Sequence, residues 1–270
     1  MASIKKALLL TCVFLGAQTM AADFENRCVI PSACFKVTTR FEPLIAEKVA
    51  LFRSRAKAAR AAGKYIGYIS IPLSTRAGRY FALNADVALR VEKRLLEQFG
   101  ADAVWILNPA SADASMFLNG ENASQSDYMY MWAQVLAGES LSGDDIDFVY
   151  FAGVADFAEY LGLPSTGQLN KLAERFEQLM KTDKKFADAV SAGKIKKAEF
   201  VSYYGFRVGA EASAGSHDEW NLIDAINEKR RKDDPKEGIA HQIPIFFNGY
   251  AVPPADSETP VAPGNALPRR

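Results

Sequence analysis

Apolar positions follow two different rhythms along the chain, and the two rhythms alternate. Where apolar residues recur every three or four positions among Ala, Lys and Arg, the spacing predicts helices. Where they form short unbroken runs between Gly, Pro or Asn, the pattern predicts strands buried on both faces. The predicted order is helix 42–62, strand 65–71, helix 80–99, strand 103–107, helix 127–137, strand 146–151 and helix 153–161.

This alternation of strands and helices predicts an α/β fold. We expect a Rossmann-like, mostly parallel sheet flanked by helices, in a single domain with a helical C-terminal extension. Helices are expected over 166–193, with a break near Thr182, and over 216–232. Residues 200–208 are expected to form a fourth strand, and Pro244 restricts the run 242–247 to an edge strand.

The first 22 residues have the pattern of a secretory signal peptide. Two lysines precede a short apolar core, and small residues follow, with cleavage expected near Ala21 or Ala22. The core is far shorter than the roughly 20 residues of a membrane span. Cys12 is a less favourable lipid-attachment site because a threonine precedes it. We expect a periplasmic or secreted protein that has no membrane association after cleavage.

Removal of that leader leaves two cysteines, Cys28 and Cys34. An even pair in an oxidising compartment predicts a disulfide, whereas a metal site needs more ligands nearby and a redox pair has CxxC spacing. We therefore divide the mature chain into a disulfide loop and helix over 23–63, the α/β domain over 64–250, and a disordered Pro-rich tail over 251–270.

Composition and charge narrow the function classes. The 270 residues are 49% hydrophobic and 24% charged, which is ordinary for a globular protein. Lys+Arg and Asp+Glu both number 32, so that loss of the two leader lysines leaves a formal −2. This balance argues against a nucleic-acid partner, which needs a basic surplus. No cofactor and no metal is expected, and the oligomeric state is left open.

Polar residues follow the ends of the predicted strands, where ligands bind in open α/β sheets. The loop 73–79 offers backbone N–H groups to a phosphate or sugar, although it lacks a Gly-rich phosphate motif and an ordinary solvated loop explains it equally well. Arg207, in the expected fourth strand, either clamps an anionic group at the strand end or packs within a buried strand. The residues expected to bind a small polar or nucleoside-like ligand are Ser70, Ser74, Asn84, Asn108 and Arg207.

Three carboxylates are candidates for catalysis. Asp156 and Glu159 are three residues apart and share one helix face, and Asp147 opens the preceding strand. Paired carboxylates divide into nucleophile and acid–base roles when their environments separate their pKa values. The structural alternative is that Asp156 caps the helix and Glu159 faces water.

The run from Ser216 to Asn221 gathers a histidine and two carboxylates, His217, Asp218 and Glu219. This combination is compatible with a metal or acid–base site. However, Ser216 and Glu219 have the spacing of a capping box, and Asp218 suits the start of a helix. Since the only other histidine is His241, the spacing gives a metal site no support.

One part of the chain resembles a known family. Residues 68–73, Asn84, the helix end at 95–100 and the strand end at 105–110 are similar to the opening βαβ unit of the nucleoside deoxyribosyltransferase-like superfamily. The shared features are a first strand ending near Ser70 and a second strand ending in Asn-Pro. The similarity covers about residues 65–110.

The resemblance implies covalent glycosyl transfer without a metal. Glu159 would attack the anomeric carbon of a nucleoside, Asp147 would assist at the base or ribose, and residues 70–74 would line the sugar pocket. Two other functions remain open: a non-catalytic periplasmic or secreted protein that binds a small ligand or a partner, and an exported hydrolase that uses the cluster at His217.

Overall fold

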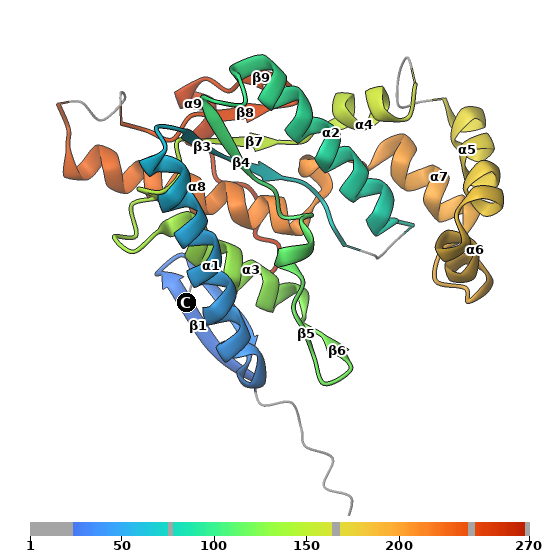
Figure 1. The fold of residues 1–270 in the computed structure, drawn as a ribbon, viewed down its shortest axis with the longest axis horizontal. Coiled ribbons are helices and arrows are strands. Elements are labelled where there is room, and N and C mark those ends of the chain that lie inside the picture. Colours follow the sequence, from blue (N-terminus) through green and yellow to red (C-terminus); the bar gives the residue numbers. More distant parts are fainter. Residues whose placement is uncertain (1–23, 75–77, 164–167, 237–240, 268–270) are drawn as a thin grey trace, which may run out of the picture.

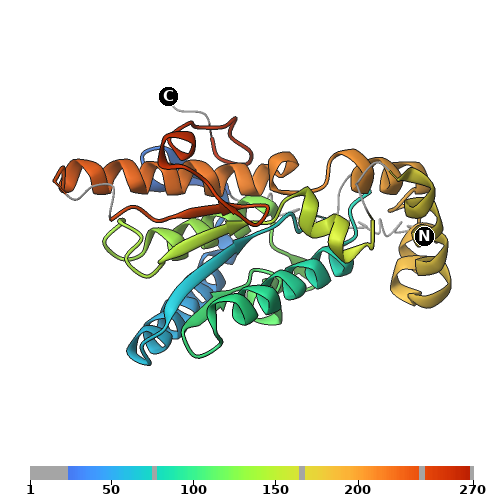
Figure 2. The ribbon, with the colours of Figure 1, turned by 90° about the horizontal axis from the view of Figure 1, so that it is seen from above.

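The computed structural model describes residues 24–74, 78–163, 168–236 and 241–267. The expected signal peptide over 1–22 lies outside these ranges. In the described part, helices cover both faces of a central sheet, which confirms a mixed α/β fold with a mostly parallel sheet (Figures 1 and 2).

The sheet has the strand order β4-β3-β7-β8-β9. β3 pairs in parallel with both β4 and β7, and β7 pairs in parallel with β8. The chain therefore moves to one side of β3 to form β4 and to the other side to form β7, so the strand order reverses between β3 and β7. The strands are β3 (Tyr65–Ser70), β4 (Val104–Leu107), β7 (Phe148–Phe151), β8 (Ile245–Phe247) and β9 (Tyr250–Ala251).

Successive β3 residues belong to different cores because side chains of a strand alternate between faces. Ile66 and Tyr68 pack in one core with α1, α3 and α8, and Ile69 packs in the other with α2, α4 and α7. Figure 2 shows α8 and α2 on opposite sides of the sheet. The helices are α1 (Glu42–Ala61), α2 (Phe81–Phe99), α3 (Gln125–Ala137), α4 (Val154–Tyr160), α7 (Lys197–Phe206) and α8 (Ala214–Asp233).

The expected fourth strand over 200–208 is wrong, because most of this segment belongs to helix α7. Phe200, Tyr203 and Tyr204 are all buried, and their spacing of three and four residues is helical. The predicted break near Thr182 is confirmed, since α5 (Leu169–Thr182) and α6 (Lys184–Ser191) meet there.

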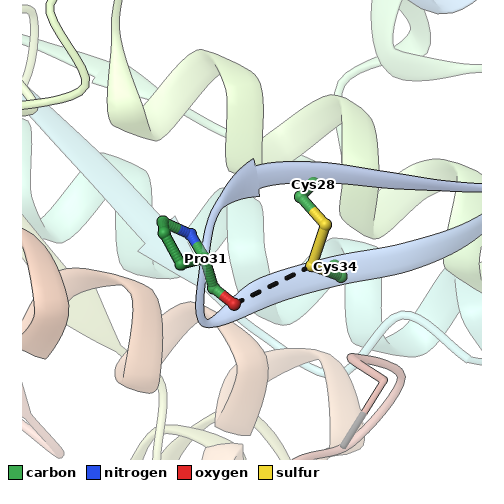
Figure 3. Close-up of a disulfide and its surroundings, with 3 residues drawn as sticks. All are labelled: Cys28, Pro31 and Cys34. Atoms are coloured by element: carbon green, nitrogen blue, oxygen red, sulfur yellow. Dashed lines mark hydrogen bonds between the residues drawn. A yellow bond between two sulfur atoms is a disulfide. The ribbon is translucent and has the colours of Figure 1, made fainter. Parts of the chain in front are cut away.

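The chain begins with a disulfide-linked hairpin of β1 (Phe24–Ile30) and β2 (Ala33–Thr38). Cys28 and Cys34 face each other across the two strands and form the expected disulfide (Figure 3). Shorter elements complete the fold: η1 (Thr39–Phe41), η2 (Ala112–Ala114), β5 (Phe117–Leu118), β6 (Glu121–Asn122), η3 (Ala210–Ala212) and α9 (Pro254–Ser257).

β8 is an interior strand, which corrects the expected edge strand over 242–247. Its outer neighbour is β9, reached through a tight turn in which Asn248 and Gly249 both have positive φ angles, 53° and 90°. Pro244 precedes the paired residues, and its carbonyl still accepts the Val149 amide at 3.0 Å. The missing proline N–H therefore lies outside the paired residues of β8.

The structure describes residues 251–267 of the Pro-rich tail, for which disorder is expected. They include the end of β9, helix α9 and an extended segment hydrogen-bonded to side chains of α8. A Pro-rich composition disfavours regular structure, but it does not prevent an extended segment from binding to a helix. Within the described ranges, no helix has the length and hydropathy needed to cross a membrane.

Candidate functional site

The carboxyl end of the central strand β3 holds a buried carboxyl group. Tyr68 and Ser70 point to the same face, and their hydroxyls donate to the two oxygens of Glu219 on α8, each at 2.5 Å. Glu219 is only 6% exposed. Burial raises the pKa of Glu219 to about 7, with Asp218 adding to the rise, while the hydrogen bonds from Ser70 and Tyr68 oppose it.

This position overturns the expected capping box at Ser216. Helix α8 starts earlier, with Ser213 as N-cap, and the Ser213 hydroxyl accepts the Ser216 amide at 3.3 Å. The earlier start moves Glu219 into the second turn of the helix. Its side chain therefore turns to the sheet and takes no part in capping.

Asp156 lies at the start of α4, immediately beyond the carboxyl end of β7. It is 3% exposed and accepts hydrogen bonds from the Gly153 amide at 2.9 Å, from the Tyr150 hydroxyl at 2.9 Å and from Arg94 at 2.5 Å. Every partner belongs to the protein itself. Asp156 thus caps the start of α4 and forms an ion pair with Arg94.

Glu159, one turn further along α4, is on the surface. Arg90 and Arg94 bind its carboxylate at 2.7 Å and 3.0 Å and link α4 to α2. The hydrogen bond from Arg90 is the main reason why the pKa of Glu159 is lowered. The carboxylate is therefore ionised, as a nucleophile must be, but it is held by two guanidinium groups.

Asp147 lies at the opposite end of β7 from Glu159. It precedes the first strand residue, accepts the Ile66 amide at 2.6 Å and forms an ion pair with Arg60 at 3.1 Å. The structure thus brings Asp156 and Glu159 together but separates them from Asp147 by the length of the strand.

The expected ligand-binding asparagines are engaged in internal hydrogen bonds. Asn84 is buried, donates to the Pro72 carbonyl at 2.7 Å and accepts from the Tyr204 hydroxyl at 2.6 Å. Asn108 donates to Glu92 at 2.8 Å and accepts the Ala110 amide at 2.9 Å, an Asx turn that ends β4.

The remaining ligand-binding candidates do not form one cluster with the asparagines. Ser70 is bound to Glu219, and Ser74 is half-buried in the loop after β3. Arg207 is exposed at the end of α7 and donates to Ser202 at 3.3 Å. None of the five expected residues lines either of the two hollows described below.

The carboxyl ends of β3 and β7 are covered by later parts of the chain. The Ala210 amide donates to the carbonyl of Ala152 at 2.8 Å, and the Asn248 amide donates to that of Phe151 at 3.1 Å. The Asn248 side chain accepts the Ala155 amide at 2.7 Å. Gly153 approaches this asparagine so closely that a Cβ would lie 2.8 Å from it. Among the described residues, backbone and side-chain groups of Ala210 and Asn248 therefore satisfy polar groups at the carboxyl end of β7.

The amino ends of the same strands border an open groove of about 830 Å³. Phe148 forms its aromatic wall with Phe99 and Phe246, at ring distances of 5.7 Å and 5.9 Å. Tyr65 and Phe99 are exposed at the groove. A smaller hollow, of about 290 Å³, lies beside the disulfide hairpin.

The polar side of the groove is organised by Arg230. Its guanidinium donates to the carbonyls of Ser142, Gly143 and His241 at 2.7, 2.9 and 2.7 Å. Burial lowers the pKa of Arg230, and the nearby Asp144 and Asp147 oppose that effect. Arg230 therefore holds the loops at residues 142–143 and 241 together, and the carboxylates of Asp144 and Asp147 also line the groove.

Sequence reasoning missed this groove. The sequence indicates the groove only weakly: Tyr65 is the first residue of a buried strand and Phe99 is the last residue of a helix, two positions at which polar residues or caps are usual. Among the described residues, no group of three or more His, Cys, Asp or Glu side chains has a geometry that would hold a metal ion.

Comparisons with protein-family models, with curated proteins and with solved structures found no match to this chain. The function must therefore be argued from the residues themselves.

Proposed function

We propose that this is an exported binding protein that takes a small, flat, nucleoside-like molecule into the groove at the amino ends of β3, β4 and β7. The observation that carries the proposal is the groove itself. At about 830 Å³ it lies within the size range of small-molecule sites, and it combines an aromatic wall with a few polar groups.

The groove chemistry suits a ring that carries several hydrogen-bond donors. Exposed rings of Tyr65 and Phe99 offer stacking surfaces. Asp144 is exposed at the groove, and its carboxylate offers acceptor oxygens to O–H or N–H groups of a ligand, such as those of a sugar and a base, whereas Asp147 is already bound by Arg60 and the Ile66 amide. Because Arg230 is fixed by three carbonyls, this acceptor side is held in place before a ligand arrives.

Export rests on the leader over 1–22 and on the disulfide between Cys28 and Cys34. Mass spectrometry of the protein from the periplasm or medium should give a chain that begins after Ala21 or Ala22. An uncleaved, cytoplasmic chain would contradict export and would leave the groove proposal to its own test.

Calorimetry of the mature chain with a panel of purine and pyrimidine nucleosides tests binding. We expect saturable heats with at least one class of base, and a loss of about tenfold in affinity in Phe99→Ala, because stacking of a base is worth on the order of 1–3 kcal/mol. Phe206→Ala is the matched control, since Phe206 is 69% exposed on α7 and does not line the groove. No binding by any nucleoside, or an equal loss in both variants, would refute the proposal.

An N-glycosidic enzyme is the second candidate, with a Rossmann-like site at the carboxyl end of β7. Glu159 supports it, because Arg90 and Arg94 keep this carboxylate ionised directly after the strand. In this proposal Glu159 forms the bond to the anomeric carbon, the base leaves with the bonding electrons, and a second acceptor later receives the sugar.

Nucleoside turnover measured by release of free base separates the two candidates. Glu159→Gln should abolish turnover if Glu159 is the nucleophile, and Glu97→Gln, an exposed glutamate on α2, should not change it. Unchanged turnover in Glu159→Gln would eliminate this second candidate. Groove binding without turnover in the native chain would favour the binding protein.

A further inference from the structure

The chain contains two Asn-Gly dipeptides, and each forms the turn of an antiparallel hairpin. Asn119 and Gly120 have φ angles of 51° and 86° and connect β5 to β6. Asn248 and Gly249 have φ angles of 53° and 90° and connect β8 to β9. Positive φ angles at both turn positions are those of a type I′ turn. The two dipeptides thus match in composition and in φ, which makes their surroundings the informative difference.

The side chain of Asn248 is fixed by the central sheet and α4. The Asn248 amide donates to the Phe151 carbonyl at 3.1 Å, and its side-chain oxygen accepts the Ala155 amide at 2.7 Å. The side chain also packs so closely on Gly153 that a Cβ added there would lie 2.8 Å from it. Rotation of this side chain therefore breaks a hydrogen bond and disturbs the packing at the end of β7.

The side chain of Asn119 has no such support. The hairpin of β5 and β6 projects beyond α3 and away from the central sheet (Figure 1). Asn119 and Gly120 are both exposed, and a Cβ added at Gly120 would meet no atom within 4 Å. Within the described ranges, no hydrogen bond holds the Asn119 side chain. This side chain is therefore free to rotate.

An asparagine followed by glycine can react with its own backbone without an enzyme. The peptide nitrogen of the glycine forms a bond to the side-chain Cγ and gives up its proton, and the bond from Cγ to the amide nitrogen breaks, which releases ammonia. Water then opens the five-membered imide at either carbonyl and gives aspartate or isoaspartate. Glycine favours this reaction because it has no Cβ to block the approach.

The rate of ring closure depends on how often the turn opens, since the side chain and the next peptide group must rotate toward each other. The hairpin around Asn119 has only two pairs of facing residues, and a two-stranded hairpin is marginally stable in water. Opening of the other turn separates β9 from β8 and removes the bond from Asn248 to Ala155. Opening is therefore easier at Asn119.

We propose that Asn119 is a site of spontaneous covalent modification, at which the Asn119-Gly120 turn converts to aspartate and isoaspartate, and that the fold protects Asn248 from the same reaction. The product places a new negative charge next to the ion pair of Glu121 with Arg40. Isoaspartate also lengthens the main chain at the turn by one carbon atom, which is incompatible with the present register of β5 and β6.

Incubation of the purified native chain near neutral pH in heavy-oxygen water tests the proposal. Peptide mapping by mass spectrometry should show, at Asn119, loss of the amide nitrogen and gain of one solvent oxygen, with both aspartate and isoaspartate present. Asn248 is the internal control and should react at least about tenfold more slowly. In urea, where both turns are lost, the two asparagines should react at similar rates because glycine follows each of them.

Asn119→Gly is the matched variant, because glycine keeps the positive φ and removes the reacting amide. On ion exchange the native chain should accumulate a more acidic form with time, and the variant should not. An Asn119 that stays intact in the folded chain but reacts in urea would overturn the proposal. Equal rates at Asn119 and Asn248 in the folded chain, or the same acidic form in the variant, would overturn it as well. None of these results depends on the groove or on export.

Discussion

The two ends of the parallel sheet differ in what covers them. At the carboxyl ends of β3 and β7, polar groups are matched by partners from the protein, among them the buried Asp156 and the half-buried Asn248. At the amino ends, aromatic rings and carboxylates border a groove open to solvent. Residue types that carry chemistry in other proteins are thus used for structure at one end and left accessible at the other.

This contrast shows that a carboxylate beside a strand end is not by itself evidence of a site. Asp156 satisfies one amide, one hydroxyl and one guanidinium, and a buried group whose bonds are all taken has little capacity left for a ligand. The rule that ligands bind at carboxyl ends holds where a crevice remains there. In this protein Ala210 and Asn248, from later parts of the chain, bind polar groups at the carboxyl end of β7.

The largest expected effect is at Asp156. Asp156→Ala should lower the free energy of unfolding by about 3–5 kcal/mol, because it leaves Arg94 and the Tyr150 hydroxyl without their buried partner. Glu159→Gln, on the same helix and bound to the same arginine, should cost only about 0–1 kcal/mol because it is on the surface. Urea denaturation checks both. Equal losses in the two variants would contradict the distinction between a buried and an exposed member.

The next effect is a pH dependence from Glu219. Its pKa is raised to about 7 in the folded protein from 4.5, so the fold favours the protonated form and the native chain should lose stability as pH rises from 4.5 through 7. Glu219→Gln carries no charge and should lack this loss. The variant should therefore gain about 3 kcal/mol relative to the native chain between pH 4 and pH 8.

Chemical denaturation at a series of pH values measures this difference. The control is Glu97→Gln, an exposed carboxylate whose curve should run parallel to that of the native chain. A Glu219→Gln curve that is also parallel to the native one would show that folding does not raise the pKa of Glu219.

A smaller effect is expected at Asn248, which closes the end of β7. Asn248→Gly keeps the positive φ of 53° but removes the acceptor for the Ala155 amide, and it should cost about 1 kcal/mol. Asn248→Ala should cost about 1 kcal/mol more, because alanine disfavours that φ. Thermal denaturation compares the two. If alanine is tolerated as well as glycine, the turn does not impose the conformation described.

Most of the fold was predictable because the spacing of apolar residues indicates which side chains are buried, and that spacing differs between helices and strands. One exception, α7, shows the limit: residues 200–208 are mostly apolar, and an apolar run fits a buried strand or a buried helix. The decisive detail was that Phe200, Tyr203 and Tyr204 have helical spacing, a pattern that is easily hidden among other apolar residues.

The candidate site was less predictable for two physical reasons. Asp147 precedes strand β7 and Glu159 follows it, so the sequence order already places the two carboxylates at opposite ends of that strand. Which other side chains lie at each end depends on how the strands pair, and the sequence alone does not give that pairing. Glu219 depends on where α8 begins: with a start at Ser216 it caps the helix, and with the observed start at Ser213 it faces the sheet. A shift of three residues in one helix start changed its role.

The smallest effect on stability is expected at the open end of the sheet. Tyr65 is 64% exposed at the start of β3, so Tyr65→Ala should change the free energy of unfolding by less than about 0.5 kcal/mol. The same variant should weaken nucleoside binding severalfold, because the ring is a stacking surface of the groove. Denaturation and calorimetry on one preparation give both numbers. A large loss of stability would mean that the amino end is packed as firmly as the carboxyl end, and unchanged binding would mean that the accessible ring is not used. A loss of affinity without a loss of stability is the result that a binding surface produces and that a structural one does not.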